Sequence, residues 1–208
     1  MARIIGPKCR KCRSAGEKMF YKGTRCTTVR CTMERNPQRP GQHGAKRQRL
    51  TDYGIHLREK QKLKKIYGLT DRAFRNYFLE AQRMTGNTGE NMLIMMETRL
   101  DNVVASCGWA ASRPQGRQLI CHRHVAVNGR IVNIPSYRVE AGDLITVYKR
   151  AKSQTLVKAY VAETKKDVLP NWVKLTPDPL QIQIVQLPKR EDITVPINEQ
   201  LVVEFATR

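Results

Sequence analysis

The stretch that decides the fold runs from Glu97 to Arg150 and reads ETRLDNVVASCGWAASRPQGRQLICHRHVAVNGRIVNIPSYRVEAGDLITVYKR. At its start, and just before it, apolar residues recur three or four positions apart, which predicts a helix with one apolar stripe. Gly108 follows where such a helix is expected to end. The stripe consists of Leu93, Met96, Leu100, Val103, Val104 and Cys107.

A second helix is predicted from Ser112. Its hydroxyl can accept a hydrogen bond from a backbone N–H of the first turn, and Gln115 can reach back to the cap. Pro114 stands in the first turn, where no backbone N–H is needed. Gly116 is less usual, because glycine inside a helix is about 1 kcal/mol less favourable than alanine. It marks either a tolerated defect or a close approach of the backbone to a partner.

After Cys121 the apolar pattern changes from helical to alternating. Asn128 and Gly129 tolerate positive φ and form the strongest short signal for a tight hairpin turn. The return strand is predicted to start at Ile131, and a further strand is predicted over residues 144–148. The stretch therefore reads as two helices, a hairpin and a returning strand.

Basic, amide and aromatic polar residues are interleaved along this stretch. Arginine forks grip phosphate oxygens, while amides and tyrosine can bond to sugars and base edges. Because the whole chain is so basic, binding to nucleic acid is favoured over the alternative of a solvated basic face. The candidate contacts are Arg99, Arg113, Gln115, Arg117, Gln118, His124, Asn128, Gly129, Arg130, Tyr137 and Arg138.

The composition points to a polyanionic partner. The 208 residues carry 38 Lys and Arg against 18 Asp and Glu, a net charge of +20, which is too lopsided for a chance surface. The charge is uneven, since residues 1–65 hold 19 of the basic and 4 of the acidic residues. No apolar run approaches the roughly 18 residues of a membrane span. The N-terminus lacks a signal-peptide core, so a cytoplasmic protein without membrane contact is expected.

Four cysteines among the first 31 residues form two close pairs separated by a loop. A chain surrounds one tetrahedral ion in this way, and four thiolates leave zinc no open position, so a structural zinc site is predicted. An iron–sulfur cluster and fortuitous spacing are the alternatives, whereas a disulfide does not suit a cytosolic chain. Metal binding would supply folding free energy to a segment that is poor in apolar residues. The predicted ligands are Cys9, Cys12, Cys26 and Cys31.

Cations surround this site and continue beyond it. Residues 35–49 have almost no apolar side chains, so we expect this loop to be mobile alone and to order on nucleic acid. An amphipathic helix over residues 55–67 is then predicted to expose an almost entirely cationic face. The candidate RNA contacts of this arm are Arg10, Lys11, Arg13, Arg35, Lys46, Arg47, Arg49, Arg58, Lys60 and Lys62.

The remaining segments complete the expected elements. Thr70 is predicted to cap a helix with an aromatic core stripe. Residues 158–166 are weakly helical, and prolines in residues 168–180 predict a surface excursion. Residues 182–187 alternate as a strand added to the same sheet would, and residues 197–205 suit either a helix or a strand. The aromatic stripe consists of Phe74, Tyr77, Phe78 and Ala81.

Motifs along the whole chain resemble a known family. RLDNVV, SRPQGRQLI and VNGRIVNIPSYRV are similar to the S-four RNA-binding module. The four-cysteine start, RPGQHGAKRQRLTDYG and the ending PINEQLVVEF extend the similarity to essentially the full length of the bacterial ribosomal protein S-four family. The resemblance implies an α+β fold, in which an all-helical body built from both ends of the chain carries an inserted module with a small, mostly antiparallel sheet. The expected parts are 1–44 for the zinc-stabilised segment and basic loop, 45–91 with 188–208 for the helical body, and 92–187 for the module.

The resemblance also implies a function. Family members bind the 5′ domain of 16S rRNA early in assembly of the small ribosomal subunit. They lie beside ribosomal protein S-five near the mRNA entry channel and influence translational accuracy, and residues matching Lys46, Arg47 and Arg49 are implicated in unwinding mRNA. Many members bind zinc through the four cysteines. The chain departs from the family pattern at Gly116, where alanine is more usual, and in residues 168–180.

Two rival functions have less support. The same module occurs in pseudouridine synthases, but Asp101 has the neighbours of a module helix, and too little chain remains for a catalytic domain. Neither enzymatic activity nor a small-molecule substrate is therefore expected. A zinc-dependent DNA-binding regulator would require tight, sequence-specific binding to duplex DNA.

Overall fold

The structure is a computed structural model that describes residues 5–46, 49–164, 169–176, 178 and 180–207. The chain forms two compact units, Met1–Met92 with Val195–Arg208, and Leu93–Thr194. The four-cysteine segment, expected as a part of its own, falls within the first unit. The chain returns to that unit at Val195 rather than at residue 188.

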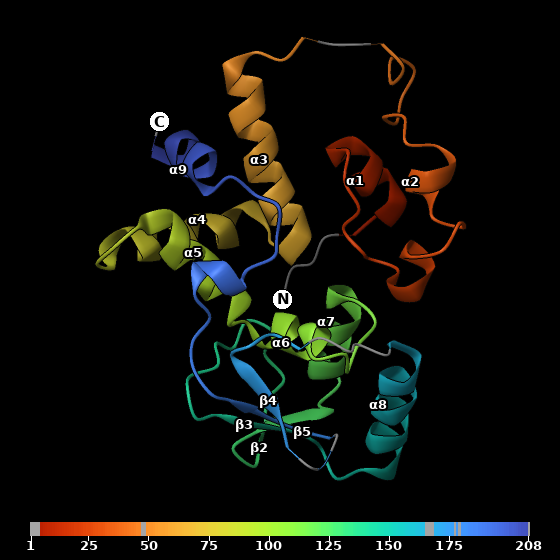
Figure 1. The fold of residues 1–208 in the computed structure, drawn as a ribbon, viewed down its shortest axis with the longest axis vertical. Coiled ribbons are helices and arrows are strands. Elements are labelled where there is room, and N and C mark those ends of the chain that lie inside the picture. Colours follow the sequence, from red (N-terminus) through yellow and green to blue (C-terminus); the bar gives the residue numbers. More distant parts are fainter. Residues whose placement is uncertain (1–4, 47–48, 165–168, 177, 179, 208) are drawn as a thin grey trace. The chain divides into compact units, whose positions relative to one another are not determined.

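The first unit is built from helices, and α9 lies beside α3 although the two are far apart in the sequence (Figure 1). α5 begins in this unit and continues into the second. The elements are α1 (Lys8–Ala15), the 3₁₀ turn η1 (Gly23–Cys26), α2 (Thr32–Arg35), α3 (Asp52–Tyr67), α4 (Asp71–Arg83), α5 (Thr88–Glu97) and α9 (Glu199–Thr207).

Local signals fix the two central helices of this unit. The Thr51 hydroxyl accepts a hydrogen bond from the Gly54 N–H at 3.3 Å at the start of α3. The Thr70 hydroxyl caps α4 in the same way, through the Ala73 N–H at 3.3 Å, as predicted. The aromatic stripe of α4 is buried as expected, so these rings form core rather than a stacking surface.

The segment that suited either a helix or a strand forms the helix α9 from Glu199 onward. Asn198 Oδ1 accepts a hydrogen bond from the Gln200 N–H at 3.1 Å near the start of α9. Val202 is fully buried, and the rings of Tyr53 and Phe205 lie 5.3 Å apart between α3 and α9. Packing on α3 therefore outweighs the strand preference of the adjacent β-branched valines.

The second unit combines helices with one five-stranded sheet of order β2-β1-β3-β5-β4, in which every pair is antiparallel. This confirms the expected α+β class with a small antiparallel sheet. The elements are α6 (Leu100–Ser106), α7 (Arg113–Cys121), β1 (Val125–Val127), β2 (Arg130–Ile131), β3 (Leu144–Val147), α8 (Ala151–Thr164), β4 (Val173–Leu175), β5 (Gln181–Ile184) and the 3₁₀ turn η2 (Arg190–Asp192).

The single helix predicted from Leu93 to Cys107 is wrong, because α5 ends at Glu97 and α6 begins at Leu100. The Leu100 N–H donates to the Tyr137 carbonyl at 2.8 Å, and the Asp101 N–H donates to the Pro135 carbonyl at 3.2 Å. A second segment thus takes backbone donors that would otherwise continue the helix. The apolar stripe stays buried on both sides of the break, which is why periodicity did not reveal it.

The predicted hairpin is confirmed. Asn128 and Gly129 have φ values of 49° and 78°, and Val127 pairs with Arg130 across the turn. Two central residues with positive φ give the turn whose twist suits an antiparallel pair. Among the described residues β2 pairs only with β1, so the hairpin forms one edge of the sheet.

The proline-rich stretch is not only a surface excursion. β4 lies within it and pairs with β5 at the other sheet edge, and Trp172 is buried in the module core with Trp109. The sequence reading relied on the prolines and missed a strand of three residues. Pro177 and Pro179 lie outside the described residues. α8 starts earlier than predicted, at Ala151, and residues 165–166 of the predicted helix lie outside the described residues.

The start of α7 differs from the predicted capping box. Ser112 makes no side-chain cap to the described helix, while Gln115 Oε1 accepts from the Ala111 N–H at 2.9 Å. Gly116 does mark a close approach, but within the chain. A Cβ atom there would lie 2.8 Å from the Asp101 carbonyl oxygen of α6, so glycine lets the two helix backbones pack closely.

Candidate nucleic-acid interface

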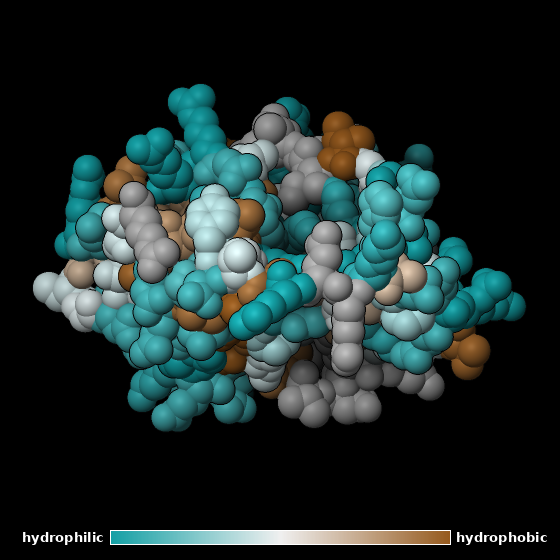
Figure 2. All heavy atoms as spheres, turned by 90° about the horizontal axis from the view of Figure 1, so that it is seen from above, coloured by the Kyte–Doolittle hydropathy of each residue, from teal (hydrophilic) through white to brown (hydrophobic). Residues whose placement is uncertain are grey.

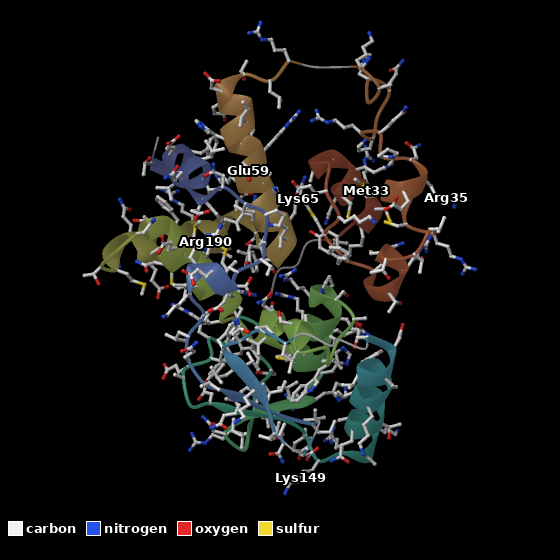
Figure 3. The ribbon with its side chains drawn as sticks, in the orientation of Figure 1. Met33, Arg35, Glu59, Lys65, Lys149 and Arg190 are labelled. Carbon is white, nitrogen blue, oxygen red and sulfur yellow. The ribbon has the colours of Figure 1, made fainter. Side chains whose placement is uncertain are left out.

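The candidate RNA contacts differ widely in exposure, and Arg47 lies outside the described residues. Figure 2 shows a face on which hydrophilic side chains predominate. Figure 3 shows Arg35 and Lys149 extending away from the ribbon. The exposed candidates are Arg10, Arg35, Lys46, Arg49, Gln118, Asn128, Gly129, Arg130, Tyr137 and Arg138, and the half-buried ones are Lys11, Arg13, Arg58, Lys60, Arg113, Gln115, Arg117 and His124.

The hairpin turn presents an exposed Arg130. The Asn128 side chain holds this turn against β3, because its Oδ1 accepts from the Leu144 N–H at 2.9 Å and its Nδ2 donates to Asp143 at 2.8 Å. The amide predicted to contact RNA therefore has a structural role in the turn. Partial burial and the nearby Asp143 carboxylate raise the pKa of Tyr137, which keeps its hydroxyl protonated as a hydrogen-bond donor.

Two arginines lie one turn apart on α7, and each meets a buried polar residue of α6. Arg113 Nε donates to Asn102 Oδ1 at 2.6 Å. Arg117 Nη1 lies 3.7 Å from Asp101 Oδ2. Because residues four apart share a helix face, the two guanidinium groups lie on the same side of α7, near its start.

Arg99 is a correction to the predicted contacts. The residue is 2% exposed, and its Nε and Nη2 donate to the two carboxylate oxygens of Asp101 at 3.0 and 2.7 Å. A buried bidentate pair of this kind holds α6 in place. It argues against RNA contact by Arg99, because reaching a phosphate would leave the Asp101 charge buried with less compensation.

The cationic face predicted for α3 is another correction. Lys62 and Lys64 are 9% and 6% exposed. Lys62 Nζ lies 2.7 Å from Glu17 Oε1 in the four-cysteine segment, and Lys64 pairs with Asp71 at the start of α4. These lysines neutralise carboxylates within the unit, which argues against the predicted phosphate contact of Lys62.

The four-cysteine segment covers this part of α3. Lys65 extends from α3 (Figure 3), and its Nζ donates to Ser14 Oγ on α1 at 2.9 Å. The Tyr21 hydroxyl donates to the Lys65 carbonyl. Burial lowers the pKa of Lys65, and the neighbouring Lys64 charge acts in the same direction. The four-cysteine segment therefore packs on α3 through basic side chains that were predicted from the sequence to be exposed.

A cavity of about 650 Å³ opens between α3, α4 and α9. Lys60 Nζ lies 4.9 Å from the ring centre of Phe205 and 5.5 Å from that of Phe74. Arg72 and Arg75 of α4 also line this cavity. Neither arginine is among the contacts predicted from the sequence, which characterised this helix only by its cap and its aromatic core stripe.

The loop after α7 carries two histidines with parallel rings. The ring centres of His122 and His124 are 6.2 Å apart, and His124 Nδ1 lies 2.8 Å from the Oγ of the buried Ser153 in α8. Burial, with the charges of His122 and Arg150, lowers the pKa of His124. His124 is therefore a neutral, anchored ring at neutral pH rather than a fixed cation.

All four predicted metal ligands line one small cavity of about 20 Å³. Cys12, Cys26 and Cys31 are buried and Cys9 is half-buried, all as free thiols. Burial raises the pKa of Cys12, a hydrogen bond from Met19 lowers it, and the other three cysteines raise it further. The Cys12 thiol therefore lies within electrostatic range of the other three cysteines.

Among the described residues, however, no three His, Cys, Asp or Glu side chains converge closely enough to hold an ion. The donor set suits a tetrahedral thiophilic metal, and several basic side chains border the cavity. The chemistry of the residues fits zinc, while their present spacing is not that of a metal centre.

Comparison with known proteins matches the two parts of the chain separately. Residues 3–97 match the ribosomal protein S4/S9 N-terminal domain, and residues 98–145 match the S4 domain. The small ribosomal subunit proteins uS4 of Thermoanaerobacter sp. (strain X514) and of Thermus thermophilus are each 48% identical, and that of Thermodesulfovibrio yellowstonii is 46% identical. All three alignments cover 100% of both chains.

The two domain matches define the class, a protein in which an S4 domain follows a ribosomal S4/S9 N-terminal domain. The chain belongs to the uS4 family of ribosomal proteins. Members of this family are ribosomal constituents and not enzymes. Along the described residues, no helix is both long and apolar enough to cross a membrane.

Proposed function

We infer that this chain is a structural constituent of the small ribosomal subunit and binds rRNA. The observation that carries this inference is the 48% identity over the full chain to proteins named as uS4. The net charge of +20 supports a polyanionic partner. Neither an RNA-modifying enzyme nor a DNA-binding regulator has comparable support, since Asp101 is occupied by a buried ion pair.

Binding through this surface is physical rather than chemical. Exposed cations on the loop after α2 and at the hairpin turn neutralise phosphates and release counterions. Folded RNA is read mainly by its shape and its 2′-hydroxyls. A protein that contacts several RNA helices at once holds their relative angles, which is what nucleation of assembly requires.

We propose further that the binding site is a helix junction in the 5′ domain of 16S rRNA, occupied early in assembly. The resemblance of the chain to the S-four family supports this placement, as well as ribosomal protein S-five as a neighbour and an influence on translational accuracy. Exposed Lys46 and Arg49 support contact with mRNA near its entry channel, and the ribosome as the place of action follows from the same family.

A structural zinc ion is the cofactor we propose. Cys9, Cys12, Cys26 and Cys31 would hold it, and their shared cavity supports this assignment. Zinc would act by stabilising a segment whose own core is small, because binding free energy becomes folding free energy in such segments. An iron–sulfur cluster is the alternative, and metal analysis of the purified protein distinguishes the two.

Competition binding tests the proposed function. A labelled transcript of the 16S 5′ domain is titrated with the protein while unlabelled RNA of equal length and unrelated sequence competes. We expect the complex to survive the competitor and to weaken linearly in a plot of log affinity against log salt. Equal loss to both RNAs would show that the charge binds without specificity and would overturn the proposed function.

A further inference from the structure

A buried amide joins α5, α6 and α7 in the second unit. Asn102 is 1% exposed, and its Nδ2 donates to both the backbone carbonyl, at 3.0 Å, and the carboxylate of Glu97. Its Oδ1 accepts from Arg113 Nε at 2.6 Å. A buried amide is costly unless its groups are paired, and here both ends of the amide have partners.

This arrangement constrains Arg113. A guanidinium carries five N–H donors in a rigid plane, so a short bond at Nε fixes the orientation of that plane. Glu97 is also buried, and its carboxylate in turn holds the Asn102 amide. Orientation therefore passes from a buried carboxylate through a neutral amide to a cation at the start of α7.

Arg99 is the contrasting case, in which the partner is a carboxylate. Its guanidinium meets the Asp101 carboxylate directly through two bonds, and it is buried. Arg113 Nε instead donates to the neutral amide oxygen of Asn102, and the residue stays half-buried. The amide oxygen of Asn102 orients the guanidinium without itself adding a negative charge beside it.

Gly116 sets the distance between the backbones of α6 and α7. The α7 backbone approaches α6 so closely that a Cβ atom would lie 2.8 Å from the Asp101 oxygen. The side chain of Asn102, which follows Asp101, is short and cannot reach across a wider gap. The close packing of the two helices therefore positions Arg113 against it.

We propose that Asn102 is a positioning residue for RNA binding, which holds the Arg113 guanidinium in the orientation that grips a phosphate. The proposal rests on the proposed binding of rRNA and deepens it. Asn102 acts before binding, because a preoriented side chain loses less conformational freedom in the complex. Ordering one long side chain corresponds to about 3- to 10-fold in affinity.

The test combines single and double variants of the full chain, measured on the 16S 5′ domain transcript at one salt concentration. Asn102→Ala and Arg113→Ala are each expected to weaken binding, and the double variant is expected to be no weaker than Arg113→Ala alone. Such non-additivity shows that Asn102 acts through Arg113. Equal further weakening by Asn102→Ala in both backgrounds would overturn the proposal.

Exchanging the acid and the amide between positions 97 and 102 provides a rescue experiment. Asn102→Asp places two carboxylates together and is expected to weaken binding, whereas Glu97→Gln with Asn102→Asp restores a donor–acceptor pair and keeps the acceptor for Arg113. Partial recovery of affinity is expected in the swapped variant, because its new carboxylate orients Arg113 but also adds a counter-charge. Thermal unfolding is measured on each variant. A swapped variant that folds like the wild type but binds like Asn102→Asp would contradict the proposal. If Asn102→Ala fails to fold, the comparison of Asn102→Asp with the swapped variant tests the proposal instead.

A spectroscopic readout separates this proposal from the proposed function. The Arg113 Nε–H should give a slowly exchanging NMR signal in the RNA-free protein that is lost in Asn102→Ala. Failure of the wild type to discriminate the transcript from competitor RNA would overturn rRNA binding. A rapidly exchanging Arg113 Nε–H in the wild type would overturn only the role of Asn102.

Discussion

The cations of α3 and those of the α7–hairpin region look alike in the sequence but differ in the structure. On α3, Lys62 and Lys64 pair with Glu17 and Asp71 and are buried. At the hairpin, Arg130 is exposed. The difference lies in the carboxylates that other segments bring, so a run of basic residues predicts an RNA contact only where no acidic side chain of the same unit meets it.

The largest effect is expected when the four-cysteine segment that covers α3 is unfolded. Cys26→Ser is expected to unfold the four-cysteine segment, because zinc can contribute on the order of 10 kcal/mol to the folding of such segments. Lys62 would then lose Glu17 and become reactive. We expect its amine labelling, followed by mass spectrometry, to rise about tenfold or more, since each factor of ten corresponds to about 1.4 kcal/mol of lost protection.

Cys121→Ser is the matched control, because Cys121 is exposed and lies in the other unit. It should leave the labelling of Lys62 unchanged. If Cys26→Ser abolishes metal binding but Lys62 stays protected, the four-cysteine segment is not what buries the α3 lysines.

The next effect concerns the buried pair that distinguishes Arg99 from its exposed neighbours. Asp101→Asn is expected to destabilise the protein by about 3–5 kcal/mol, because it leaves a buried guanidinium without its counter-charge. Urea unfolding measures the loss. Replacing both partners, as Arg99→Met with Asp101→Leu, should recover part of it. A double variant less stable than Asp101→Asn would show that Arg117, 3.7 Å from Asp101, depends on this carboxylate more than Arg99 does.

A paired substitution compares the two regions directly. Lys62→Met is expected to lower stability by about 1–2 kcal/mol through the lost ion pair and to leave the salt dependence of rRNA binding unchanged. Arg130→Met should change stability by less than about 0.5 kcal/mol and reduce the log–log salt slope by about 0.7–0.9. The reverse pattern would make α3 the RNA-binding face.

The smallest effect is a pH dependence at the module. Burial lowers the pKa of His124 below 6.5, so the unfolded chain binds the proton more tightly than the folded chain does. Stability should therefore fall as the pH drops from 6.5 through the folded-state pKa. His124→Asn should flatten this part of the profile in urea midpoints measured between about pH 7.5 and about pH 5, and identical profiles would remove His124 as the cause.

Much of the fold could be predicted from the sequence, where local chemistry decides the outcome. The Asn128-Gly129 turn, the Thr70 cap and the aromatic stripe of α4 depend on residues close in the chain, and all three are confirmed. The break after Glu97 could not be predicted, because it depends on carbonyl groups at residues 135 and 137.

The candidate site was harder to predict for the same reason. The spacing of the four cysteines indicated that they would come together, and they line one cavity. Spacing could not show which lysines of α3 meet carboxylates from residues 17 and 71. Asp101 and Asn102 were interpreted as parts of a helix, and only the packing of α6 on α7 shows that they hold Arg117 and Arg113. A polar pair between the apolar residues Leu100 and Val103 was the one available signal.

Lysine labelling of the wild-type protein, free and bound to the 16S 5′ domain transcript, tests the central claim most directly. The internal pairs predict that Lys62 and Lys64 stay unreactive in both states, while exposed Lys46 reacts in the free protein and is protected by RNA. A Lys62 that reacts freely without RNA and becomes protected with it would contradict the claim that internal carboxylates decide which cations bind RNA.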